Sequence, residues 1–213
     1  WLNIDNTRKI FSKAELDFEA LKLAAQEVSF KAVPMGLNTS INLQSTFKKS
    51  LSKNVVGILP GSEASEEYFL YMAHWDHLGM DTTLDGDKIY NGALDNASGT
   101  AALLELAEAF STGGQAKRSI IFLAVTAEEQ GLLGSAYYGA NPIYPLSQTV
   151  AGLNMDGINW FGKTKDISIM GYGFSELDSY VEMAANLQGR YIAPDATPEK
   201  GSFRGPDHHT KDS

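Results

Sequence analysis

Two periods of hydrophobic and polar positions run along the chain, and they predict helices in some segments and strands in others. In the first thirty residues, apolar side chains recur at nearly helical spacing among charged ones, which predicts helix. Residues 31–49 lose that period, and the alternation in NTSINLQSTFK (38–48) predicts an extended strand with one polar face. A short apolar strand is expected over 55–59, and the polar run SEASEE (62–67) is expected to form a turn.

From residue 68 onward, predicted strands alternate with predicted helices. We expect strands over 68–77, 119–125, 149–156 and 166–171, and helices over 95–110, 131–140 and 175–188. Buried strands that alternate with helices are typical of a mostly parallel sheet flanked by helices. We therefore predict an α/β fold with three layers, αβα, around a mostly parallel mixed central sheet.

The polar residues that end the predicted buried strands are all of types that bind metal ions. They are His74, Asp76 and His77, then Glu128 and Glu129, then Asp156. In open α/β sheets, functional groups collect at the carboxyl ends of the strands. The sequence therefore predicts that these side chains meet at one edge of the sheet and form a site there.

Composition narrows the chemistry of that site. The 213 residues include no cysteine, so disulfides, thiolate zinc sites and cysteine nucleophiles are excluded, and His, Asp and Glu must hold any metal ion. The net charge of −9 argues against nucleic-acid binding, because it repels phosphate backbones. No apolar run approaches the roughly 20 residues that a membrane span needs. No signal peptide is expected from the first residues, although this does not place the protein in the cytosol.

His74 lies in the segment YMAHWDHLG, near the end of a predicted strand. Residues two apart in a strand point to the same side, so Asp76 is placed to accept the second N–H of a metal-bound His74 or to lie just behind the metal. A core histidine hydrogen-bonded to a neighbouring aspartate would give the same pattern. His77 is the alternative ligand, but it falls one residue into the turn on the opposite face, which favours His74.

Asp95 lies in GALDNASG, just before a helix of small residues. Its other common role is to cap a helix N-terminus. Asn96 and Ser98 could cap equally well, so Asp95 is not required for capping. The small residues on both sides allow close approach of the backbone, and a carboxylate that bridges two cations would fit here.

Glu128 and Glu129 are adjacent at the end of an apolar strand and would repel each other if both were buried without a cation. One carboxylate could bind a metal ion while the other accepts a proton from metal-bound water as a general base. A solvated acidic turn before a helix is the alternative interpretation. Asp156, in LNMDG, would be an ordinary turn residue if it stood alone.

The four segments AHWDHLG, GALDNASG, AEEQGLLGS and LNMDG, in this order and spacing, resemble the co-catalytic two-zinc aminopeptidase family. That family includes bacterial secreted leucyl-type aminopeptidases, plasma glutamate carboxypeptidase and the glutaminyl cyclases. The resemblance implies a zinc-exopeptidase-like fold that binds two Zn²⁺. It also implies a role for each site residue: His74, Glu129 and Asp156 as ligands, Asp95 as the ligand that bridges both ions, Glu128 as general base and then general acid, and Asp76 behind the metal.

The same resemblance implies an aminopeptidase that acts on peptides with a free N-terminus, a cis peptide bond between Asp95 and Asn96, and a secreted or periplasmic location. Three other activities on this fold are dipeptidase, carboxypeptidase and glutaminyl-cyclase-like acyl transfer. A further alternative is a binding module without catalysis, although such modules usually lose ligands or the base. Here the first four motifs are complete.

The C-terminal segment KGSFRGPDHHTKDS departs from the family pattern. The family's last ligand is a histidine after an aspartate, which makes His208 the expected fifth ligand and His209 its alternative. The closing helix and strand of the family are missing after this point. We expect residues 1–213 to form one zinc peptidase catalytic domain, and a shortened sequence, without the protease-associated insertion of larger members, would explain the missing parts.

Overall fold

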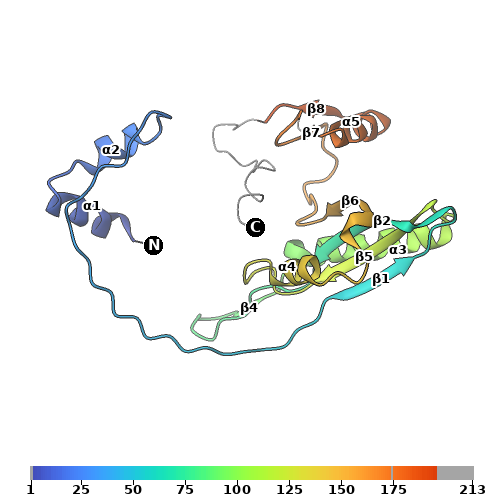
Figure 1. Cartoon of the computed structure of the whole chain (residues 1–213), viewed down its shortest axis with the longest axis horizontal. Coiled ribbons are helices and arrows are strands. Elements are labelled where there is room, and N and C mark those ends of the chain that lie inside the picture. The colour runs from blue at the N-terminus through green and yellow to red at the C-terminus, as the bar shows by residue number, and fades with distance from the viewer. Residues whose placement is uncertain (1, 174, 196–213) are drawn as a thin grey trace. The chain divides into compact units, whose positions relative to one another are not determined.

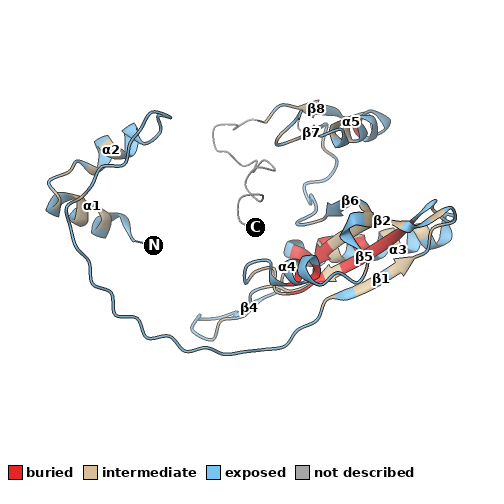
Figure 2. Cartoon of the chain, viewed as in Figure 1, coloured by how far each residue is buried: buried red, intermediate tan, exposed pale blue. Residues whose placement is uncertain are grey.

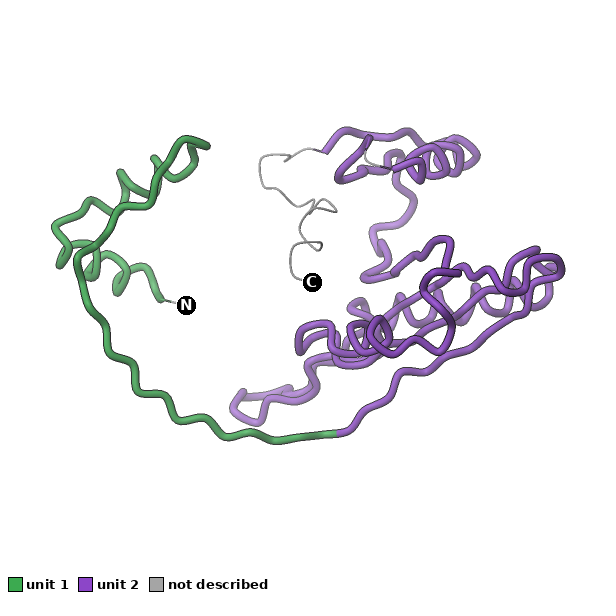
Figure 3. The backbone as a smooth tube through the Cα atoms, in the orientation of Figure 1, with its two compact units in different colours: residues 1–50 green, residues 51–213 purple. Residues whose placement is uncertain are grey.

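The computed structural model describes residues 2–173 and 175–195. The chain divides into two compact units, residues 1–50 and residues 51–213 (Figure 3). Each unit is described by itself. None of the described helices combines the length and the apolarity that crossing a membrane requires.

The first unit contains two short helices where the sequence predicted continuous helix. They are α1 (Ile4–Lys13) and α2 (Phe18–Ala24). The break between them includes Glu15, which has a positive φ of 55° that a right-handed helix cannot accommodate. Edge-to-face contact between the rings of Phe11 and Phe18, whose centroids are 5.0 Å apart, joins the two helices.

The strand predicted over residues 38–48 is wrong. These residues have no regular secondary structure, and no strand pairs with them in the part of the chain that the structure describes. The apolar side chains of the alternating pattern, Ile41, Leu43 and Phe47, are exposed. Alternation indicates where side chains would point in a strand, but strand formation also needs a partner whose side chains pack against it.

The second unit is built on a four-stranded sheet (Figure 1). Its strands, in spatial order, are β1 (Val55–Leu59), β5 (Arg118–Val125), β2 (Ala64–His74) and β6 (Thr149–Asn154). β1 is antiparallel to β5, whereas β5, β2 and β6 are parallel to one another. The prediction of a mostly parallel mixed sheet is confirmed.

The turn predicted over residues 62–67 is wrong from Ala64 onward, because β2 already begins there. Ala64 pairs with Arg118, and the register then shifts before Tyr68. The intervening polar residues therefore form an irregular start of the strand. Backbone hydrogen bonds to the neighbouring chain, including the bond from Ala64 N to the Lys117 carbonyl, outweigh the preference of these polar residues for a turn.

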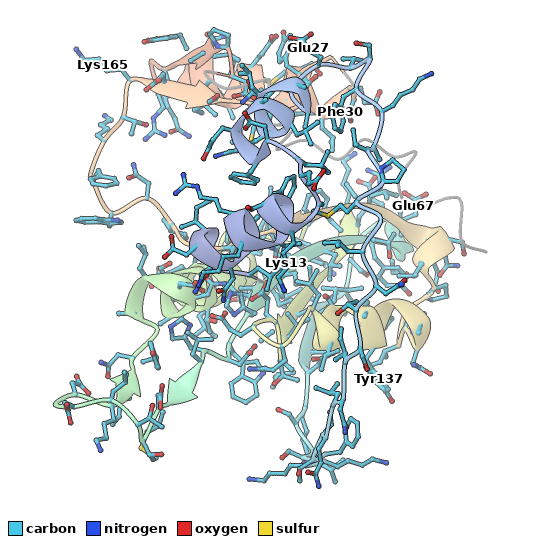
Figure 4. All side chains as sticks on the ribbon, turned by 90° about the vertical axis from the view of Figure 1, so that its left-hand side faces the viewer. Lys13, Glu27, Phe30, Glu67, Tyr137 and Lys165 are labelled. Atoms are coloured by element: carbon cyan, nitrogen blue, oxygen red, sulfur yellow. The ribbon has the colours of Figure 1, made fainter. Side chains whose placement is uncertain are left out.

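Helices cover both faces of this sheet, as predicted. Alternate residues of β5 point to opposite faces. Ile121, Leu123 and Val125 pack in one cluster with Tyr138 of α4 (Leu133–Ala140), and Ile120 and Phe122 pack in another with Leu103 of α3 (Ser98–Thr112). Figure 2 shows the buried residues along β2 and β5, and Figure 4 shows all side chains, among them that of Tyr137 on α4, which is exposed. The three layers are thus α4, the sheet and α3.

The remaining elements are short. They are the hairpin of β3 (Gly79–Met80) and β4 (Ile89–Tyr90), the kinked segment η1 (Ala93–Ala97), a 3-10 turn η2 (Leu146–Gln148), the parallel pair β7 (Asp166–Ser168) and β8 (Tyr191–Ala193), and α5 (Leu177–Leu187). The helix predicted from residue 95 begins instead at Ser98, because Asp95 and Asn96 have non-helical backbone angles. This departure puts Asp95 in a bend, not on a helix.

Candidate metal centre

The predicted site residues lie just past the carboxyl ends of three neighbouring strands. His74 is the last residue of β2 and pairs with Val125, the last residue of β5. Glu128 and Glu129 follow β5, and Asp156 follows β6 after a backbone bond from Met155 N to the Met72 carbonyl. Because these strands are parallel and adjacent, their ends bring the side chains to one edge of the sheet.

One group of ligand-type side chains consists of His74, Asp95 and Asp156. His74 Nε2 lies 3.1 Å from Asp95 Oδ1 and 3.2 Å from Asp156 Oδ1. Ligand atoms about 2.0 Å from a tetrahedral zinc ion lie about 3.3 Å apart, so this spacing suits a shared cation. His74 itself is buried, whereas the two aspartates are exposed.

The His74 ring is oriented by the backbone of Asp76. Its Nδ1 lies 3.0 Å from the Asp76 carbonyl oxygen, so Nδ1–H donates there and Nε2 is left facing the carboxylates. The Asp76 carboxylate was predicted as the partner of this N–H, but its Oδ1 is 3.8 Å away and accepts a hydrogen bond from Glu128 N instead, at 3.1 Å. β2 ends at His74, so the two-residue alternation no longer fixes where Asp76 points.

A second group consists of His77, Asp95 and Glu129. His77 Nδ1 and Glu129 Oε1 are only 2.6 Å apart, yet both atoms are buried and neither makes a hydrogen bond to a described residue. Buried polar atoms are ordinarily partnered. The unpartnered Glu129 oxygen beside Asp95 fits a metal ion, whereas the contact with His77 is shorter than the about 3.3 Å between two ligands of one zinc ion.

Asp95 is the one residue that belongs to both groups. Its peptide bond to Asn96 is cis, which confirms the expectation from the sequence. The side chain of Asn96 is buried and fixes this bend: Nδ2 donates to the Met155 carbonyl at 2.9 Å, and Oδ1 accepts from Gly99 N at 2.9 Å and from Gly157 N at 3.2 Å. Asn96 therefore ties the bend that carries Asp95 to the loop that carries Asp156.

Glu128 faces the first group without being part of it. Its Oε2 lies 3.9 Å from His74 Nε2. Burial raises the pKa of Glu128, the negative charges of Asp156, Glu129 and Asp95 raise it further, and His74 lowers it by less. A carboxylate with a raised pKa beside a ligand group is well suited to exchange a proton.

The pKa of His74 is shifted by opposing effects. Burial lowers the pKa, but the hydrogen bonds to the Asp76 carbonyl and to Asp156, together with the charges of Asp156 and Glu128, raise it by more. The net direction is upward. An imidazole surrounded by acceptors in this way attracts a positive charge, whether a proton or a metal ion.

The structure adds two residues to the site that sequence reasoning did not assign. His77 had been weighed only as a rival of His74, whereas the structure brings both histidines to Asp95. Asn96 had been considered only as a helix cap. The signal that could have revealed His77 is the chain turn after His74, because a residue in a turn is not bound to one face of the sheet. His208 and His209 lie outside the described residues.

Residues 54–211 match the profile of Peptidase family M28. The chain belongs to this family. The M28 match confirms the resemblance to the co-catalytic zinc peptidases that the four motifs indicated. Among curated M28 relatives, the aminopeptidase NAALADL1 of Mus musculus is 32% identical over 129 residues, which cover 58% of this chain and 16% of the mouse protein.

Two further comparisons agree with the M28 assignment. The glutamate carboxypeptidase 2 homolog of Caenorhabditis elegans is 33% identical over 129 residues, which cover 58% of this chain and 15% of the worm protein. A crystal structure of a zinc aminopeptidase from Bacillus subtilis shares the fold with a TM-score of 0.53 and 24% identity, over 66% of this chain and 34% of that one. The chain thus spans only a small part of the length of these curated relatives.

Proposed function

We propose that this M28 chain is the catalytic part of an aminopeptidase that hydrolyses N-terminal peptide bonds with two zinc ions. The observation on which the proposal depends is that one carboxylate, that of Asp95, belongs to both groups of ligand-type side chains. A carboxylate shared in this way can bridge two ions. The names of relatives support the metal and the activity, since the mouse relative is an aminopeptidase and one from Pyricularia oryzae, 36% identical over 107 residues, is a probable zinc metalloprotease.

In this proposal the ligands divide between the two sites. His74 and Asp156 would hold one ion, Glu129 would hold the other, and Asp95 would be shared by both. Bound zinc supplies a Lewis acid that polarises the scissile carbonyl and lowers the pKa of bound water. The carbonyl oxygen of Asp76 keeps the His74 ring in the tautomer that leaves Nε2 free to bind.

Glu128 is the proposed general base. Its carboxylate accepts the proton of the attacking water and then donates it to the nitrogen of the leaving amine. The bond from Glu128 N to Asp76 Oδ1 fixes the backbone of this residue beside His74. The surrounding carboxylates leave negative charge at the site, which favours the ammonium group of a substrate with a free N-terminus.

The test of the proposal is the replacement Glu128→Gln. The amide cannot take a proton, so we expect kcat/KM for an aminoacyl-anilide to fall by about 100- to 10,000-fold while zinc content, measured by atomic emission, is unchanged. Asp85→Asn is the matched control, because it also removes one carboxylate but lies exposed in the loop between β3 and β4. Wild-type protein that retains no zinc, or a Glu128→Gln variant that is fully active, would contradict the proposal.

Carboxypeptidase activity is the second candidate, because the worm relative is a glutamate carboxypeptidase 2 homolog. The two activities differ in which end of the peptide must be free. An aminopeptidase cleaves unblocked peptides and leaves N-acetylated ones intact. Cleavage of the N-acetylated peptide at its C-terminal residue would favour the carboxypeptidase instead.

A further inference from the structure

We propose that Trp160 and Phe161 bind an apolar side chain of the peptide substrate, next to the bond that is cleaved. This inference rests on the aminopeptidase activity proposed above and adds to it two residues that select the substrate. Both lie in the loop between β6 and β7, which also carries Asp156 (Figure 1). Neither is part of the four motifs or of the groups of ligand-type side chains.

The two rings form an exposed stack. Their centroids are 4.2 Å apart and their planes differ by 28°. Trp160 is 67% exposed and Phe161 is 79% exposed. Among the ring contacts between described residues, this is the only one in which both rings are exposed. Adjacent large apolar side chains that stay in contact with water are typical of a surface that binds another molecule.

The loop fixes the stack through its own hydrogen bonds. Asn159 Nδ2 donates to the Gly162 carbonyl at 2.8 Å, and Asn159 Oδ1 accepts from Phe161 N at 2.9 Å. One side chain therefore holds the backbone on both sides of the two rings. Aromatic side chains also have only two χ angles, so the pair loses little conformational entropy when it binds a partner.

The start of the loop is attached to the bend that carries Asp95. Ile158 N donates to Ser98 Oγ at 3.0 Å, and Ser98 follows Asp95 by three residues. Trp160 comes two residues after Ile158, so its Cα atom lies within about 7 Å of the Cα atom of Ile158. A peptide substrate spans about 3.5 Å per residue. A side chain next to the scissile bond is therefore close enough for the stack to contact when that bond lies at the metal centre.

A contact surface for a partner protein is the competing explanation of the exposed rings. The two roles differ in what the rings discriminate. A stack that binds substrate changes the relative rates for substrates that differ in one side chain. A surface for a partner protein changes no rate, or changes all rates by the same factor.

The experiment compares kcat/KM of the intact zinc-loaded protein for three dipeptide amides, phenylalanyl-alanine amide, alanyl-phenylalanine amide and alanyl-alanine amide. The ring precedes the scissile bond in the first and follows it in the second, so the comparison also shows which substrate side chain the stack contacts. Apolar contacts discriminate such substrates by about 10- to 200-fold. Wild type should therefore prefer one phenylalanine substrate over alanyl-alanine amide by at least about 10-fold.

Trp160→Ala and Phe161→Ala should each reduce this preference to less than about 3-fold, because each removes half of the apolar stack. Trp160→Phe keeps a ring at this position and should keep most of the preference. Tyr137→Ala is the matched control, because Tyr137 is an aromatic residue of α4 with a similar exposure of 66%, and it should leave the preference unchanged. An unchanged circular dichroism spectrum shows that the variants are folded.

The inference and the proposed function fail in different ways. A wild type without the preference, a preference that persists in both alanine variants, or an equal fall for all three substrates overturns the role of the stack and leaves the aminopeptidase standing. A wild type that cleaves none of the amides contradicts the aminopeptidase. Calorimetric titration of the same amides then decides the inference: tighter binding of a phenylalanine amide that Trp160→Ala abolishes supports it, and equal binding by wild type and variant overturns it.

Discussion

The two ligand groups around Asp95 are built in different ways. In the first group, His74 ends a central strand, is buried, and is oriented by a carbonyl oxygen two residues away. In the second group, His77 lies in a turn beyond the strand and is positioned by packing against Tyr90 and Gly92. The first group depends on the register of the sheet, and the second depends on the conformation of two loops.

This difference has a consequence for binding. A ligand fixed by sheet register is already in place before the metal arrives, so the first ion should bind tightly and require little rearrangement. A ligand fixed by loops is ordered less strongly, since loops open more easily than central strands. We therefore expect the first ion to bind more tightly than the second.

The largest effect is expected from Asp95→Asn, because Asp95 is common to both groups. A neutral amide cannot bridge two cations, so each ion should be weakened by more than the roughly 100-fold that loss of a supporting residue causes. Peptidase activity should fall by at least about 1,000-fold. Zinc titration and anilide hydrolysis measure the two effects, with Asp85→Asn as the control. If only one ion were weakened, Asp95 would belong to one group and the comparison would fail.

Much of the fold around the first group could be predicted from the sequence. The apolar run of β5 and the helical patterns of α3 and α4 are strong local signals, and parallel strands place their ends at one edge. The exceptions, residues 38–48 and 64–67, depend on pairing. An alternating segment forms a strand only with a partner, and a polar segment becomes a strand when a neighbour offers its backbone.

The site residues that lie at the ends of strands could be predicted from strand geometry. His74, Glu128, Glu129 and Asp156 come together as expected, since His74 ends a parallel strand and the other three follow the ends of its two neighbours. The role of His77 could not be predicted, because the two-residue alternation stops where β2 ends. For the same reason the partner of the His74 N–H is the carbonyl of Asp76, and not its carboxylate.

Asn96→Ala should break the link that holds the first group together. It removes three hydrogen bonds, so that the buried N–H group of Gly99, the Met155 carbonyl and the N–H group of Gly157 lose their partner. Because buried unpaired groups are costly, the free energy of unfolding should fall by about 2–4 kcal/mol in urea titrations of the metal-free protein. The first ion should be weakened more than the second, since Gly157 adjoins Asp156.

Asn159→Ala is the matched control for this change. Asn159 also makes two side-chain hydrogen bonds, to the Gly162 carbonyl and from Phe161 N, but it is exposed and both bonds stay within its own loop. Its replacement should change the free energy of unfolding by no more than about 0.5 kcal/mol. Equal destabilisation by the two variants would mean that Asn96 does not link the bend to the loop of Asp156.

Gly92→Ala tests whether the close packing at Gly92 positions the second group. Gly92 has a φ of 64°, and an added Cβ would lie 2.9 Å from both His77 Cβ and the Asp95 carbonyl oxygen. Gly86, with a φ of 79°, has open space around it, so Gly86→Ala introduces only the backbone strain of about 1–2 kcal/mol. Gly92→Ala should be more destabilising than Gly86→Ala because the loop must also shift away from His77. That shift should weaken the second ion in zinc titrations and spare the first, whereas Gly86→Ala should change neither. If Gly92→Ala instead weakened the first ion more, the loops would not be what positions the second group, and the contrast between the two ways of building a ligand set would not hold.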